Sequence, residues 1–254
     1  MTKMEIEKLI VPQGHKEPIT ILEGVAAKPL PLFDYQGYQY TALDVKSFCE
    51  LVKAKGKQPS ALIFSDDAGF TAILDDTVIS RKQDTVTMPY TYSVQMEEWE
   101  PVLSPGGHVF ALKELIDYVK RADGKTIDNF ESLLSSFKNF KYVSNVTGDF
   151  TFDNRNNYTF CVKVKDAEGT VRIPQTFCAN VEIFKNSDWF QWMEIEVEIS
   201  QPKSAGEQPL FLLSCPKFPR YLQAAQENLY EQMKKELDGW LVVQGRPTDR
   251  PAKG

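Results

Sequence analysis

The sequence predicts an α+β fold, with largely antiparallel sheets and about three to four helices packed against them. Stretches with strand-like alternation and stretches with helical spacing come in separate runs, without the strand–helix–strand order that parallel sheets need. Aromatic residues make up 12% of the 254 residues, and their flat rings suit the pleated surface of a sheet. Both observations favour sheets with helices set apart from them.

We expect four parts along the chain. They are an irregular N-terminal arm (1–40), an α/β subdomain (41–140), a β-rich subdomain ending in a helix (141–245) and a disordered tail (246–254). Prolines and glycines interrupt the arm, where one short strand is expected near residues 19–22. The spacing of apolar residues changes from helical to alternating after residue 140, which places the subdomain boundary there.

Four segments carry helix signals. "TALDVKSFCELVKAKG" places Thr41 and Asp44 at the spacing of a capping box and ends at Gly56. Residues 109–124 are amphipathic, and residues 126–140 form a second pattern of this kind that begins at a threonine. These segments are expected to be helical over their full length.

The fourth helix, residues 218–240, has an apolar stripe formed by Leu222, Ala225, Leu229 and Met233. Docking of this stripe on the sheet is the simpler interpretation. Self-association through the stripe is the alternative, because a terminal element with large apolar residues is easily shared between chains.

Strands are expected where side chains alternate between apolar and polar. The expected strands are 60–64, 70–75, 84–96, several between 141 and 184, then 189–200, 209–215 and 241–245. Residues 97–108, which contain "EEWEPVLSPGGH", are expected to connect a strand to a helix.

Four aspartates in "FSDDAGFTAILDD" raise the question of a divalent-metal site. Asp66 and Asp67 lie at a predicted hairpin turn, and Asp75 and Asp76 lie beyond the following strand. Eight residues of strand at ~3.3 Å each separate the two pairs by roughly 26 Å. Ligands of one ion must lie within about 2.0–2.6 Å of it. Turn-forming surface aspartates are therefore the favoured interpretation.

No catalytic or cofactor-binding motif is present in the sequence. The four cysteines form no C-x-x-C pair, the nucleophile elbow and the zinc and dinucleotide motifs are absent, and "SPGGH" is a weak match to a phosphate loop. We therefore expect a non-enzymatic protein without a metal or cofactor. The net charge of −6 argues against a broadly basic nucleic-acid-binding protein. Free thiols, no signal peptide and no long apolar run predict a cytoplasmic protein that does not enter a membrane.

Two segments supply candidate binding residues. In "WFQWMEIEVEIS", alternation puts Phe190 and Trp192 on the strand face that carries three glutamates, and this face is expected to meet solvent or a partner. In "NRNNYTFCVKVK", Arg155 and Tyr158 belong to a modest basic–aromatic mixture. A solvated hairpin is the simpler interpretation of the second segment.

The order of several segments resembles the YfdQ-like family of phage and prophage proteins, whose activity is unassigned. The similarity covers about residues 8–247 and is carried by "YTALDVKSFCELVKAKG", "ALIFSDDAGFTAILDD", "MEEWEPVL", "FALKELIDYV", "IPQTFCANVEIF" and "LFLLSCPKFPRYLQAA". Trp99 matches the family's tryptophan-containing segment and is a further candidate binding residue. The family's Asp-His element has no counterpart, since "LDDTVISRKQDTVTMPY" lacks histidine.

The resemblance implies a phage- or prophage-encoded accessory protein in the cytoplasm of the host cell. We expect such a protein to bind a host, phage or defence component, with assembly into a homo-oligomer left open. One alternative is a nucleic-acid-binding accessory of recombination or replication. Another is a cryptic metal-dependent nuclease or phosphatase that uses Asp66, Asp67 or Asp75.

Overall fold

The computed structural model describes residues 36–78, 82–122, 126–140, 150–152, 157–164, 167–200 and 208–247. The predicted strand near residues 19–22, most of the predicted arm and most of the predicted tail lie outside these ranges. The described residues belong to one unit that begins at Gln36. None of their helices combines the length and the hydropathy needed to cross a lipid bilayer.

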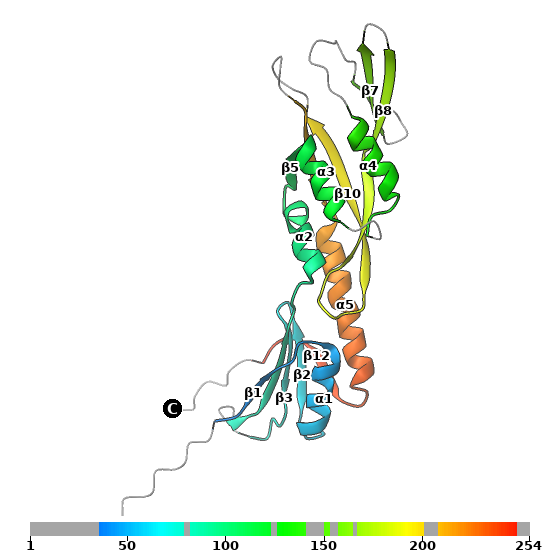
Figure 1. Ribbon diagram of the computed structural model, residues 1–254. Helices are drawn as coiled ribbons and strands as arrows, with labels where there is room; N and C mark the ends of the chain where they lie inside the picture. The colour runs from blue at the N-terminus through cyan, green and yellow to red at the C-terminus, as the bar shows by residue number, and fades with distance from the viewer. Residues whose placement is uncertain are drawn as a thin grey trace, which may run out of the picture. The chain divides into compact units, whose positions relative to one another are not determined.

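Three sheets organise the described residues (Figure 1). The first has the order β1-β4-β3-β2-β12, with β1 (Gln39–Thr41), β2 (Leu62–Asp66), β3 (Gly69–Ile73), β4 (Thr85–Pro89) and β12 (Leu241–Gln244). The second has the order β5-β11-β10-β9, with β5 (His108–Ala111), β9 (Thr176–Glu182), β10 (Phe190–Ser200) and β11 (Leu210–Ser214). The third is β6-β7-β8, with β6 (Phe150–Phe152), β7 (Asn157–Val164) and β8 (Ala167–Pro174).

The pairing of these strands confirms the α+β prediction. The second and third sheets are antiparallel throughout. The first sheet is mixed, because β1 runs parallel to β4 and β12 runs parallel to β2. The described ranges contain five helices: α1 (Val45–Lys55), α2 (Val94–Leu103), α3 (Leu112–Arg121), α4 (Phe130–Asn139) and α5 (Phe218–Glu236). The expected number of three to four was therefore one too low.

The additional helix is α2, which we expected to be the end of a strand and a connector. Its N-cap is Ser93, whose hydroxyl accepts a hydrogen bond from the backbone N–H of Met96 at 3.0 Å. Its inward face is made by Met96, Trp99, Val102 and Leu103, which have helical spacing. Pro101 lies inside this helix and normally argues against one. Burial of the four apolar side chains outweighs that local preference.

Three predicted helix boundaries also differ from the structure. Asp44, not Thr41, is the N-cap of α1, and its carboxylate accepts from the backbone N–H of Ser47 at 2.7 Å. The segment from residue 109 begins as strand β5, which pairs with β11, before α3 starts. Helix α4 begins only at Phe130, because Ile127 first forms an isolated bridge with Ala179. In the latter two segments, strand pairing takes residues that an isolated helix would use.

Helices α2, α3 and α4 pack on one face of the second sheet. The indole of Trp99 on α2 lies 6.2 Å from the ring of Phe177 on β9, and Phe137 on α4 meets Phe211 on β11 edge-to-face at 6.0 Å. Leu115 on α3 is fully buried. The apolar side chains of this sheet face and of the three helices form the core, and Trp99 is buried in it.

The alternation predicted for residues 189–200 is confirmed. Met193, Ile195 and Val197 of β10 are buried, whereas Phe190 and Trp192 are 50% and 49% exposed. Strand side chains point alternately to the two faces of a sheet. The aromatic and acidic face of β10 is therefore the one turned away from α2, α3 and α4.

Helix α5 connects the second sheet to the first. At its start the ammonium of Lys217 pairs with the carboxylate of Glu194 on β10 at 2.8 Å. Near its end Met233 is fully buried, and the Cys49 thiol of α1 donates to its sulfur at 3.4 Å. Ala225 and Leu229 are also buried, so the stripe predicted to dock on the sheet is used inside the chain.

Replacing Met233 by alanine is expected to lower the free energy of unfolding by about 2–5 kcal/mol, because it removes a fully buried side chain and leaves a cavity between α1 and α5. Urea denaturation followed by circular dichroism measures this. The control is Lys235→Ala on the exposed side of α5, with an expected change within about 0.5 kcal/mol. Equal effects of the two substitutions would contradict this packing.

Candidate functional site

The aspartates of residues 64–76 are structural. Asp66 closes the β2–β3 turn by accepting from the backbone N–H of Ala68 at 2.9 Å. Gly69 in this turn has φ +143°, and a side chain there would lie 2.2 Å from the carbonyl oxygen of Met88. Asp66 pairs with Gly69 at the turn end of the hairpin, whereas Asp75 follows the other end of β3. The predicted separation of the two pairs is confirmed.

Asp75 is held by its own set of partners. Its carboxylate meets the ammonium of Lys57 at 2.8 Å and accepts hydrogen bonds from the hydroxyls of Thr77 and Ser60 at 2.5 and 3.1 Å. The hydrogen bond from Lys57, followed by that from Thr77, lowers the pKa of Asp75 well below its usual range. The arrangement anchors the end of the hairpin.

The described side chains include no cluster of metal ligands and no cysteine thiol whose pKa is lowered. No three His, Cys, Asp or Glu side chains among them converge as metal ligands. Burial raises the pKa of the thiols of Cys49 and Cys215 to about 11 in each case, so both remain protonated near neutral pH. These thiols behave as small apolar groups of the core.

The predicted binding residues do not form one site. Phe190 and Trp192 lie on the outward face of β10, opposite Glu182 and Asn180 of β9. Arg155 and the side chain of Tyr158 lie outside the described residues, so their predicted role stays a prediction. Trp99 is only 2% exposed, and it contributes a wall to a pocket instead of an open surface.

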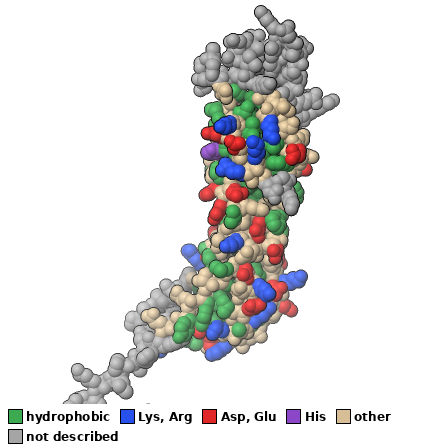
Figure 2. Space-filling view, in the orientation of Figure 1, with side chains coloured by type: hydrophobic (Ala, Val, Ile, Leu, Met, Phe, Trp, Pro, Cys, Tyr) green, Lys and Arg blue, Asp and Glu red, His purple; other side chains and the backbone are tan. Residues whose placement is uncertain are grey.

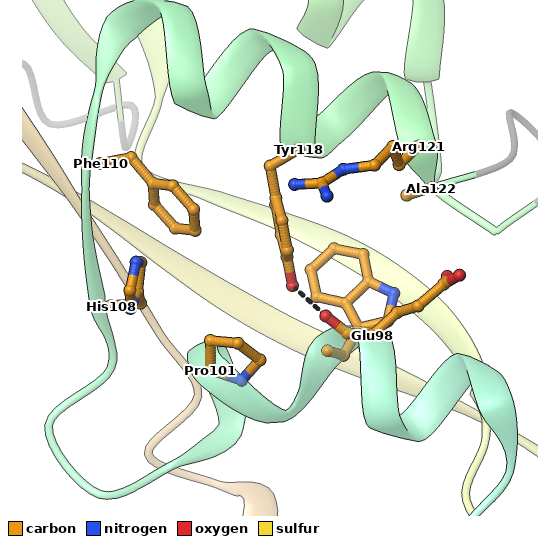
Figure 3. A pocket seen from close by; sticks show the side chains of 8 residues that line it. Glu98, Pro101, His108, Phe110, Tyr118, Arg121 and Ala122 are labelled. Atoms are coloured by element: carbon orange, nitrogen blue, oxygen red, sulfur yellow. Dashed lines mark hydrogen bonds between the residues drawn. The ribbon is translucent and has the colours of Figure 1, made fainter.

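That pocket has a volume of about 280 Å³ and is lined mainly by rings (Figure 3). The ring centroids of His108 and Phe110 are 4.5 Å apart, those of Phe110 and Tyr118 are 4.9 Å apart, and those of Tyr118 and Trp99 are 5.5 Å apart. Arg121 places its guanidinium 5.8 Å from the Tyr118 centroid. We call this the aromatic pocket.

Three elements build the aromatic pocket. Trp99 comes from α2, His108 and Phe110 from β5, and Tyr118 and Arg121 from α3. Of these residues only Trp99 was predicted from the sequence, because the convergence of the others depends on the unexpected helix α2 and the unexpected strand β5. The three-residue spacing of Tyr118 and Arg121 on one helix face was the available local signal.

A larger groove of about 650 Å³ lies where α2, the second sheet and the start of α5 meet. Its apolar walls include Met96 and Leu103 of α2, Leu212 of β11, and Phe218 and Leu222 of α5. We call it the α2–α5 groove. The groove was not predictable from the sequence, because its walls are more than a hundred residues apart in the chain.

The charges in the α2–α5 groove are acidic. Glu100 on α2 and Glu198 on β10 line it, both exposed, and no Lys, Arg or His is among its lining residues. Neither carboxylate forms an ion pair within the described residues. The groove therefore repels phosphate and favours an apolar ligand that carries a positive charge.

The remaining surface shows no comparable concentration of one charge on the face drawn in Figure 2. There, Lys and Arg side chains alternate with Asp and Glu over the described residues. This face lacks the continuous basic stripe by which proteins follow a nucleic-acid backbone.

The chain matches no known protein-family model, and neither a curated protein nor a solved structure is significantly similar to it. The resemblance to YfdQ-like proteins stays a prediction.

Substituting Asp75 by asparagine is expected to destabilise the protein more at pH 7 than near pH 3. The folded-state pKa of Asp75 is lowered, so its stabilising effect is present above the unfolded-state pKa of about 3.9. That effect is lost as the pH falls below this value toward the folded-state pKa. Urea denaturation of both proteins at pH 7 and near pH 3 measures the difference, and a pH-independent difference would contradict the ion pair.

Proposed function

We propose that this protein is a non-enzymatic accessory protein that binds a partner protein through the α2–α5 groove. The single observation that supports the proposal is the groove's combination of apolar walls with Glu100 and Glu198 and no lining cation. Ligand grooves are mostly apolar, with a few placed polar groups that orient the ligand. A volume of about 650 Å³ fits several side chains of one segment.

The occupant that fits best is an apolar segment with a Lys or Arg at each end or on one face. Its apolar side chains would contact Leu103, Leu212 and Leu222, and its charges would meet the two glutamates. Opposite charges across an interface fix register and speed association, whereas apolar contacts supply most of the affinity. An acidic or phosphorylated segment would be rejected.

The proposal includes the setting that the family resemblance implies: a phage or prophage gene and a host or defence component as partner in the host cytoplasm. Assembly into a homo-oligomer is the alternative: Ala225, Leu229 and Met233 of the α5 stripe are buried within the chain, and Leu222, which is half-buried, lines the groove.

Site-specific crosslinking tests the groove directly. With p-benzoylphenylalanine in place of Ser104, an exposed residue of the groove rim, illumination in the host cell is expected to attach one dominant partner. The crosslinked peptide, identified by mass spectrometry, is expected to contain apolar residues together with Lys or Arg. The matched control places the same amino acid at Lys113, an exposed residue of α3 that lines neither site. The same partner at both positions, or an acidic crosslinked peptide, would refute the groove as the docking site.

Charge reversal gives a second test. Glu198→Lys is expected to weaken binding of that partner at least tenfold, because the new ammonium repels the partner's cation and removes its counter-charge. Glu50→Lys on the exposed side of α1 carries the same change in net charge and is expected to leave binding within about twofold, since exposed charges far from the contact are screened. Affinity is measured by isothermal titration calorimetry in 150 mM salt.

A further inference from the structure

The aromatic pocket has rigid walls. The hydroxyl of Tyr118 on α3 donates to the backbone carbonyl of Glu98 on α2 at 3.0 Å, which fixes the ring between the two helices. Burial raises the pKa of this hydroxyl, so it stays protonated and keeps the bond. In Figure 3 the rings of His108, Phe110, Tyr118 and Pro101 surround an open space. A flat ring placed there has aromatic faces and edges to contact.

One cation and one anion line the aromatic pocket, Arg121 of α3 and Glu98 of α2, and in Figure 3 Arg121 lies across the Tyr118 ring from His108 and Phe110. Arg121 reaches toward Tyr118 from α3, and its guanidinium forms no ion pair or side-chain hydrogen bond with the described residues. Its guanidinium donors are therefore free to bind an anion, in the paired geometry that carboxylates and phosphates accept. Glu98 also lines the pocket, but its side chain points away from Tyr118 and His108 in Figure 3.

We propose that the aromatic pocket binds a small molecule that has a flat aromatic ring and an anionic group, the ring lying against Tyr118, Phe110 and His108 and the anion on Arg121. The site is separate from the α2–α5 groove and does not depend on the function proposed for it. Aromatic carboxylates and nucleotides share this chemistry.

Two observations favour this ligand over others. A cationic ligand would compete with Arg121 for the face of Tyr118 and would be repelled by the guanidinium. The volume of about 280 Å³ lies just below the range of about 300–1,000 Å³ that holds drug-sized ligands, so it suits one or two fused rings and not an extended chain.

Binding is tested on the full chain with probes that separate ring from charge. By isothermal titration calorimetry, 2-naphthoate is expected to bind at least tenfold more tightly than 2-naphthamide, which has the same shape without the charge. Cyclohexanecarboxylate, an anion without an aromatic ring, is expected to show no binding at millimolar concentration. AMP and adenosine form a second pair, and tighter binding of AMP assigns nucleotides to the site, whereas binding of 2-naphthoate alone assigns aromatic carboxylates.

Matched variants locate the anion. Arg121→Gln is expected to reduce the affinity for 2-naphthoate to that for 2-naphthamide. Lys120→Gln removes the same charge from the neighbouring residue, which is exposed and pairs with Asp117 at 3.7 Å, and it is expected to have an effect below twofold.

Proton NMR of the native chain locates the aromatic ring of the bound ligand. The chain has two histidines, His15 and His108, and a ligand ring in the pocket shifts the imidazole signals of His108 by its ring current while those of His15 stay in place. The proposal is overturned if neither 2-naphthoate nor AMP binds, if the amide binds as tightly as the acid, if Lys120→Gln weakens binding as much as Arg121→Gln, or if the signals of His108 do not move.

Discussion

Helix α5 links the two larger sheets, because it packs against β10 of the second sheet and against α1, and its Tyr230 hydroxyl donates to the backbone carbonyl of Val242 on β12 of the first sheet at 3.4 Å. Its first turn is fixed to β10 through the Lys217–Glu194 ion pair, and its last turns bury Met233 against α1 before the chain enters β12 of the first sheet. Ala225, Leu229 and Met233 of this helix belong to one continuous apolar core that includes residues of both sheets. Phe218 and Leu222, in the first turns of this helix, line the α2–α5 groove together with Met96 and Leu103 of α2.

Both candidate sites border helix α2. This helix buries Trp99 and Met96; Glu98, Trp99 and Pro101 line the aromatic pocket, and Met96, Glu100 and Leu103 line the α2–α5 groove. The aromatic pocket has a guanidinium and rings, whereas the α2–α5 groove has aliphatic walls and carboxylates. Opposite charges and different wall chemistry make them suited to different ligands, an anionic ring and a basic apolar segment.

Elements with a clean period were predictable from the sequence, and elements decided by tertiary contacts were not. The two faces of β10 follow from strict alternation, and the buried stripe of α5 follows from helical spacing. Helix α2 was missed because Pro101 and the preceding "TMPYTY" favour extended chain locally, while burial of Trp99 decides the outcome. The sites were missed because Arg121, Glu198 and Leu222 converge only in the folded chain.

Hydrogen–deuterium exchange of the protein with and without its cellular partner is the decisive test of the α2–α5 groove as the docking site. If the groove holds the partner, amide exchange will slow at the end of α2 and at the β11–α5 corner, around residues 100–106 and 212–222, and will stay unchanged along β7 and β8. Protection confined to the outward face of β10 at Phe190 and Trp192, with the groove segments exchanging as in the free protein, would contradict it.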